Sequence, residues 1–252
     1  MGHISEKFRR GGCFMKYYLC FAAMGAVLLV FFVREKLRSY CVRALFWKTA
    51  VSVMFMAAGA AAAGAIPAAS AQRGFSWFVL GGLLFGLLGD IWLDLKYVYP
   101  QDDARYTYAG FTVFSIGHIL FILGMLRYYA DFSRPLVVIV PLAAGFALGV
   151  GNGLLGPVMK LKFGRFKGIV MFYGGILFAM TLLAGSLALD QGFQNGALDW
   201  MFAGGILFAV SDLILSRTYF GEGYERPVDI IANYVFYYAA QFAISASLLF
   251  VV

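Results

Sequence analysis

The sequence predicts an all-α, polytopic membrane protein with about eight transmembrane helices. Of its 252 residues 62% are hydrophobic and only 13% are charged, whereas soluble domains carry about 25% charged residues. The apolar residues gather in runs of about 20, the length at which a helix crosses the hydrocarbon core. Strands of a membrane barrel would instead alternate apolar and polar residues over about 10 positions, and no stretch of this chain does so.

The apolar runs give the expected spans. They cover residues 15–33, 44–64, 77–95, 107–126, 135–154, 168–188, 198–216 and 228–251. The connections between them are too short to hold a soluble domain. The chain is therefore expected to have an N-terminal tail, residues 1–14, and a single transmembrane helical domain, residues 15–252.

The first four spans each carry or adjoin charged or polar residues. The first is followed by the charged sequence REKLR, residues 34–38. The second begins after Arg43 and has Lys48 near its start. The third carries Asp90 and the fourth His118, each inside an apolar run. An ionisable group at membrane depth costs about 2.5–3.5 kcal/mol on insertion scales, so such residues indicate function.

The last four spans follow the same pattern. The fifth ends at the turn-like sequence GNGLLGP, residues 151–157, and the sixth follows a basic loop, residues 160–167. The seventh carries Asp212. The eighth has polar side chains in its first half and middle: Asn233, Tyr237, Tyr238 and Gln241.

The net charge of +7 indicates lipid surfaces rather than nucleic acid, because short basic loops beside membrane helices attract anionic headgroups. Lysines and arginines are more abundant in the odd-numbered connections, which favours those connections inside and both termini outside. Basic residues in the tail favour the opposite, so orientation stays open. The compact chain favours a bacterial plasma membrane.

Asp90 and Asp212 lie in matching contexts. GGLLFGLLGDIWL (81–93) and GGILFAVSDLIL (204–215) both read Gly-Gly-x-Leu-Phe and then, with a one-residue gap, Asp-x-x-Leu. Four crossings separate the two spans, so they run in the same direction. Both acids come late in their spans. They are therefore expected in the same half of the membrane, near the odd-numbered connections.

The aspartates have two interpretations. In the first, each serves a structural role by pairing with Lys48 or capping a backbone group. In the second, the two carboxyl groups approach each other, so that one stays protonated while the other is ionised. Active sites that combine an acid and a base have this arrangement. Asp94 follows one helical turn after Asp90, but its place at the membrane boundary favours a solvated interfacial acid.

Other polar residues also leave alternatives open. Lys48 has three possible roles: it neutralises an acid, binds a phosphate, or extends its ammonium group to the membrane interface. His118 is a metal ligand or a hydrogen-bonded structural residue, and zinc needs more nitrogen or sulfur donors than this sequence offers. No metal is expected. The tyrosines and Gln241 of the eighth span line a cavity or join helices.

Five motifs in order resemble the YhhN-like lysoplasmalogenase family. They are FWKTAV around Lys48, the Gly-Asp motif at Asp90, GFTVFSIGHILFILG around His118, the Ser-Asp motif at Asp212, and YYAAQFAIS from Tyr237. The resemblance extends over most of the chain. It implies an eight-helix membrane hydrolase that cleaves the vinyl ether of lysoplasmalogen to a fatty aldehyde and a glycerophospho-headgroup, without a cofactor.

The resemblance also implies site residues. Asp90 and Asp212 would be the catalytic pair. The candidate substrate-binding residues at the same depth are Lys48, His118, Asn233, Tyr237, Tyr238 and Gln241. Vinyl ether hydrolysis needs one protonated carboxyl to protonate the alkene carbon and one carboxylate to stabilise the resulting cation and deprotonate water. Which aspartate is the acid stays open.

Two other functions compete with this hydrolase. A proton- or cation-coupled transporter also has internal repeats and acids near mid-membrane, although Gly or Pro interruptions near these acids are few. A lipid-binding or assembly protein would use the aspartates only to hold helices together. Lysophospholipid and membrane lipids are the expected partners in the first case.

Overall fold

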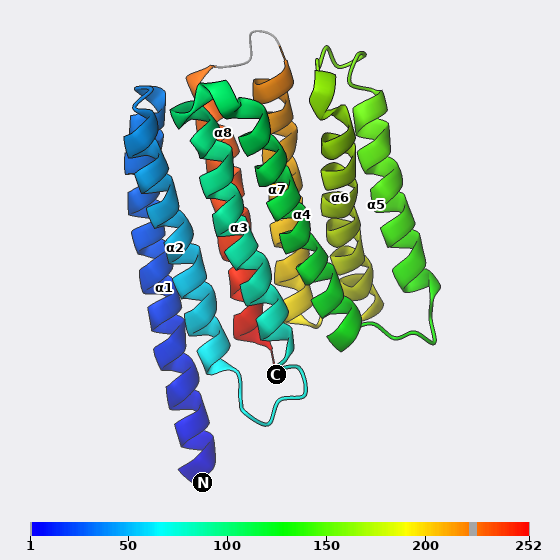
Figure 1. The fold of residues 1–252 in the computed structure, drawn as a ribbon. Coiled ribbons are helices and arrows are strands. Elements are labelled where there is room, and N and C mark those ends of the chain that lie inside the picture. The colour runs from blue at the N-terminus through cyan, green and yellow to red at the C-terminus, as the bar shows by residue number, and fades with distance from the viewer. Residues whose placement is uncertain (1, 222–225, 252) are drawn as a thin grey trace.

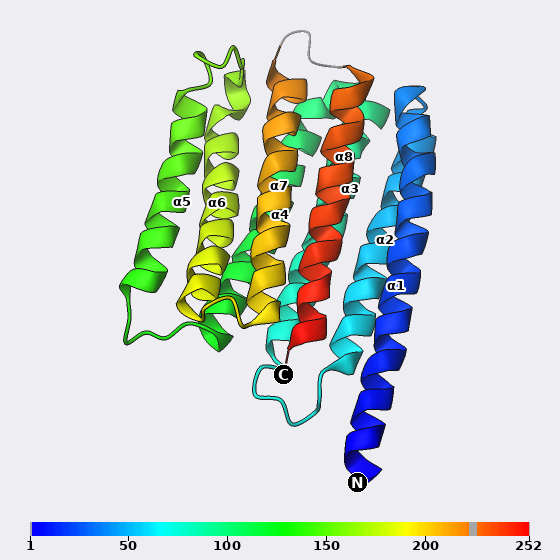
Figure 2. The ribbon, with the colours of Figure 1, turned by 180° about the vertical axis from the view of Figure 1, so that it is seen from behind.

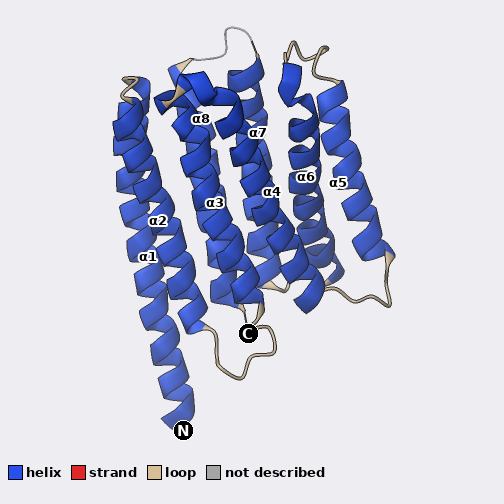
Figure 3. Cartoon of the chain, viewed as in Figure 1, coloured by secondary structure: helices blue, strands red, loops and turns tan. Residues whose placement is uncertain are grey.

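The structure is a computed structural model that describes residues 2–221 and 226–251. In these residues it consists of α-helices and short 3-10 segments, without a strand (Figures 1 and 3). The α-helices are α1 (Gly2–Leu37), α2 (Cys41–Ala65), α3 (Phe75–Val98), α4 (Asp103–Tyr128), α5 (Leu136–Leu154), α6 (Lys167–Asp190), α7 (Gly196–Phe220) and α8 (Pro227–Ala246). The prediction of an all-α polytopic membrane protein is confirmed.

Each expected span coincides with a helix. Within the described ranges, seven helices are long and apolar enough to cross a membrane, and α8 is the exception. α8 nevertheless runs alongside α7, α1 and α2 (Figure 2). Because α1 begins at Gly2, the backbone of the expected tail continues the helix of the first span. The division between tail and domain stays a prediction.

The helices alternate in direction, so the helix ends fall into two groups. The upper end in Figure 1 holds the connections from α1 to α2, from α3 to α4 and from α5 to α6. The end of α7 and the start of α8 also lie there. Both termini lie at the lower end. α3 and α7 therefore run in the same direction, as the sequence predicts, and Asp90 and Asp212 both lie in the upper half of their helices.

Consecutive helices pack as antiparallel pairs. α8 also packs against α2, α1 and α3, which places its polar face inside the molecule. α5 packs mainly against α6, at the outer edge (Figure 1). Large apolar side chains are exposed on the outer helices, among them Val27, Val30, Ile139 and Val140. Such a surface is suited to lipid rather than water.

Glycines allow α5 and α6 to approach closely. A Cβ atom built on Gly149 would meet the backbone nitrogen and Cα of Gly175, and one on Gly145 would meet the backbone of Ala179. Small residues at these positions permit backbone contact, which is how membrane helices associate without a hydrophobic driving force.

We expect Gly149→Ala to lower the apparent melting temperature of the detergent-purified protein. The added methyl group meets backbone that has no side chain to move aside, and such overpacking costs about 1–3 kcal/mol. Gly168→Ala is the matched control, because a Cβ there meets nothing within 4 Å. Equal melting temperatures for Gly149→Ala and the wild type would contradict the close contact between α5 and α6.

Candidate functional site

A buried cluster of charges joins three helices. The Nζ atom of Lys48 on α2 lies 3.3 Å from Oδ1 of Asp90 and 3.3 Å from Oδ1 of Asp94, both on α3. Lys36 Nζ on α1 lies 3.2 Å from the same oxygen of Asp94. Lys48, Asp90 and Asp94 are 3%, 2% and 2% exposed. Charges so buried are tolerated only when they are paired, so Lys48 acts as the counter-charge for both acids.

Hydroxyl groups complete the surroundings of Asp90. Ser52 Oγ donates to Asp90 Oδ2 at 2.6 Å, and the Tyr237 hydroxyl donates to the same oxygen at 2.7 Å. Gln241 Nε2 in turn donates to the Tyr237 hydroxyl at 3.0 Å. The Tyr238 hydroxyl donates to the Lys48 carbonyl oxygen at 3.2 Å. A carboxylate with a cation and two hydroxyl donors is stabilised as an anion.

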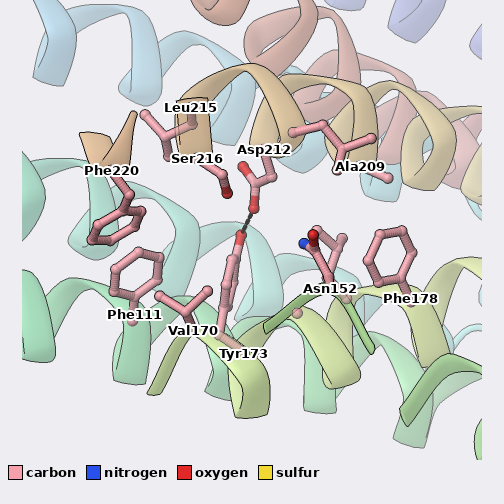
Figure 4. Close-up of a pocket in the computed structure, with 13 residues that line it drawn as sticks. Phe111, Asn152, Val170, Tyr173, Phe178, Ala209, Asp212, Leu215, Ser216 and Phe220 are labelled. Atoms are coloured by element: carbon pink, nitrogen blue, oxygen red, sulfur yellow. Dashed lines mark hydrogen bonds between the residues drawn. The ribbon is translucent and has the colours of Figure 1, made fainter. Parts of the chain in front are cut away.

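Asp212 has different surroundings. The Tyr173 hydroxyl of α6 donates to Asp212 Oδ2 (Figure 4). In the part of the chain that the structure describes, Asp212 makes no ion pair. Phe111, Leu215 and Val170 lie around it. Asp212 therefore has a neutral hydrogen-bond partner, in a pocket that Ser216 and Asn152 also line, whereas Asp90 has a cation.

Asp90 and Asp212 line one cavity, here called the central cavity. Its volume of about 30 Å³ exceeds the roughly 10–15 Å³ that a water molecule needs. Charged and polar side chains from α2, α3, α6, α7 and α8 meet there: Lys48, Asp90, Tyr173, Ser211, Asp212, Tyr219, Asn233, Tyr234 and Tyr237. The two aspartates of the sequence repeat are thus brought to the walls of the same cavity.

Two further hollows adjoin the central cavity. The upper pocket, about 340 Å³, lies between the upper ends of α1, α2, α3, α7 and α8, and shares Leu215, Tyr219, Asn233 and Tyr234 with the central cavity. The lateral groove lies between α5, α6 and α7 and shares Phe111, Tyr173, Asp212 and Leu215 with it (Figure 4). Its wall includes Leu213, which is 42% exposed on the outer face of α7.

Asn233 and His118 lie differently from the other candidates. Asn233 Nδ2 donates to the Ser211 carbonyl oxygen at 2.8 Å, so it joins α8 to α7 while also lining the cavity. His118 is 1% exposed and packs against Phe208, with ring centroids 4.7 Å apart. It is not among the residues that line the central cavity. Within the described ranges neither of its ring nitrogens has a hydrogen-bond partner.

Two interpretations from the sequence are wrong. Asp94 is not a solvated interfacial acid, because Lys36 and Lys48 enclose it. Lys48 does not extend to the interface, because both acids hold it in the interior. The position of Lys36 depends on how α1 crosses α3, which no local pattern in the sequence reveals.

Sequence reasoning also missed Tyr173 and Ser52. A signal for Tyr173 was present, because it directly precedes a third copy of the Gly-Gly-x-Leu-Phe motif, residues 174–178. That copy is followed by no aspartate, so it does not match the Gly-Gly-x-Leu-Phe…Asp pattern of the other two. Ser52 lies one helical turn after Lys48, on the same face of α2, but an isolated serine in a membrane helix gives no signal of its own.

We expect Lys48→Met to lower the melting temperature strongly, because it leaves Asp90 and Asp94 buried with only Lys36 nearby. Breaking a buried ion pair costs about 3–5 kcal/mol. Lys167→Met, at an exposed site on α6, is the control and should melt like the wild type. Adding Asp90→Asn to Lys48→Met should recover part of the loss, because Asp94 keeps Lys36 as its partner whereas Asp90 has no other cation. A double variant no more stable than Lys48→Met alone would contradict the assigned ion pair.

Comparison with known proteins identifies a family for most of the chain. A family model described as the YhhN family matches residues 43–248. The matched region includes Lys48, both repeat aspartates and the polar face of α8. No curated protein and no solved structure matches the chain in the corresponding comparisons.

Proposed function

Because the chain belongs to the YhhN family, we propose that it is a membrane hydrolase that cleaves the vinyl ether bond of lysoplasmalogens. The products are a fatty aldehyde and a glycerophospho-headgroup. The observation that carries this proposal is the central cavity, which has room for a water molecule and is flanked by one aspartate paired with a lysine and one paired only with a phenol.

The surroundings assign a different role to each aspartate. Asp90 is the carboxylate, because Lys48, Ser52 and Tyr237 all stabilise negative charge on it. Asp212 is the general acid, because among the described residues no cation pairs with it and burying an ionised carboxyl without a counter-charge is costly. Two carboxyl groups in unlike environments divide acid and base roles in this way.

The reaction balances with these two groups and one water molecule. Asp212 gives its proton to the alkene carbon remote from the ether oxygen, which leaves an oxocarbenium ion beside the Asp90 carboxylate. Water adds to the cationic carbon as Asp90 takes its proton. Asp90 then protonates the departing glycerol oxygen while the hemiacetal hydroxyl returns a proton to Asp212. The carbon–oxygen bond to glycerol breaks, the aldehyde forms, and both acids regain their starting states.

The hollows around the aspartates suit a lipid substrate. The upper pocket and the lateral groove both share residues with the central cavity. A separate hollow of about 610 Å³ at the lower end, between Gln72, Tyr129 and Gln194, shares no lining residue with any of them. A cavity that adjoins hollows at the upper end and at the side of the molecule suits a lipid substrate, which enters from within the membrane.

We expect Asp90→Asn and Asp212→Asn each to reduce aldehyde release from lysoplasmalogen by at least about a hundredfold, the usual contribution of a positioned acid or base. Purified protein is assayed in detergent with a dehydrogenase-coupled readout of aldehyde. Asp199→Asn is the matched control, since Asp199 lies on the same helix as Asp212 but in its first turn. Full activity in both site variants would refute the proposed mechanism.

Tyr173→Phe should lower kcat about threefold to tenfold, because it removes a single hydrogen bond that orients Asp212. The control Tyr108→Phe removes a phenol whose hydroxyl donates to the Arg165 carbonyl oxygen on the exterior, and should leave kcat as in the wild type. A Tyr173→Phe enzyme with the wild-type kcat would show that this contact does not position the acid.

A further inference from the structure

Gln241 is buried beside the site but does not line the central cavity. It is 1% exposed, and it is not among the residues that line the central cavity, the upper pocket or the lateral groove. Its Nε2 atom donates to the Tyr237 hydroxyl oxygen at 3.0 Å, whereas its Oε1 atom has no partner in residues 2–221 and 226–251. The part of Gln241 that reaches the site is therefore its amide nitrogen.

The chemistry of Asp90 fixes the direction of this contact. An ionised carboxylate only accepts hydrogen bonds, and a phenol has a single proton to donate. The Tyr237 hydroxyl lies 2.7 Å from Asp90 Oδ2, so its proton points to Asp90. The hydroxyl can then accept only from a donor on its other side, which is the amide N–H of Gln241. Every proton in this chain of three groups points toward the carboxylate, and such a chain strengthens each of its bonds.

Gly86 leaves room for the amide. A Cβ atom built on Gly86 would lie 2.7 Å from Gln241 Nε2, which is closer than real side-chain contacts come. Gly86 precedes Asp90 by one turn of α3, as Tyr237 precedes Gln241 by one turn of α8. In the second copy of the sequence repeat the residue after Gly-Gly-x-Leu-Phe is Ala209 instead of a glycine. The space for a glutamine therefore belongs to the Asp90 copy.

We propose that Gln241 is a positioning residue, whose amide holds the Tyr237 proton on Asp90 and so keeps the carboxylate turned toward the central cavity. Gln241 acts only through Tyr237 and does not contact the reacting atoms. This role rests on the proposed function, in which Asp90 is the base, but the direction of the Tyr237 proton is measurable without any hydrolysis.

The kinetic test is a double-mutant cycle of Gln241→Met and Tyr237→Phe. Methionine is similar in length to glutamine but donates no hydrogen bond. We expect Gln241→Met to lower kcat about threefold to tenfold, the worth of one hydrogen bond, and to leave KM within about twofold, because Gln241 does not bind the substrate. In the Tyr237→Phe background the same change should leave kcat within about twofold. Gln194→Met, at an exposed position, is the matched control.

Two results of the cycle would overturn the inference and leave the proposed function intact. The first is a wild-type kcat in Gln241→Met. The second is an equal loss of kcat in both backgrounds, because a glutamine that only stabilises the fold does not need the Tyr237 hydroxyl.

Gly86→Ala tests the same contact from α3. The added methyl group displaces the amide, so kcat should fall about as far as in Gln241→Met. In the Gln241→Ala background, where no amide is present, Gly86→Ala should leave kcat within about twofold. Gly81→Ala on the same helix is the matched control, because a Cβ there meets only the end of the Leu120 side chain. A wild-type kcat in Gly86→Ala would overturn the inference.

The spectroscopic test needs no substrate. The infrared C–O stretch of isotope-labelled tyrosine depends on whether the phenol only donates a hydrogen bond or also accepts one. We expect Gln241→Met to shift the band of one tyrosine, and to shift none in the Tyr237→Phe background. That result in a protein that releases no aldehyde would support the assigned direction of the proton and refute the proposed reaction. A Gln241→Met spectrum identical to that of the wild type would overturn the inference.

Discussion

The ammonium group of Lys48, shared between Asp90 and Asp94, is the interaction on which the rest of the site depends. The buried charges of Lys48, Asp90 and Asp94 are tolerable only because they are paired, with Lys36 supplying the second positive charge. Since Asp90 and Asp94 are one turn apart on α3, a single lysine from α2 reaches both. Lys36 and Tyr237 then connect α1 and α8 to the same carboxylates. These contacts hold α1, α2, α3 and α8 together around the Lys48 ammonium group.

This arrangement makes the two repeat aspartates unequal. The halves of the repeat match in sequence, but only the first copy faces a lysine. The second meets a tyrosine that follows the third Gly-Gly-x-Leu-Phe copy, on α6. Similar segments therefore deliver the same side chain into two electrostatic environments, and this difference is what acid–base chemistry between two carboxyl groups requires.

The fold and much of the site could be predicted from the sequence, because hydropathy and direction of crossing constrain a membrane protein strongly. Counting crossings placed Asp90 and Asp212 in the same half, and the structure agrees. α8 was expected as a span like the others, yet Asn233, Tyr237 and Gln241 make it too polar to meet the criterion for one. The partners of Asp94 and Asp212 could not be predicted, because Lys36 and Tyr173 come from helices whose neighbours only tertiary packing decides. The isolation of His118 among aromatic rings is equally a result of packing.

The position of the site in the upper half of the helices has a consequence for the two leaflets of the membrane. Both aspartates and the pocket that adjoins them are nearer one surface. An enzyme built in this way draws lipid from one leaflet only, and a substrate in the other leaflet must first be flipped. Under the proposed function, the water-soluble product would be released into a single compartment, whereas the aldehyde would stay in the hydrocarbon layer. Membrane asymmetry would then set how much substrate the enzyme can reach.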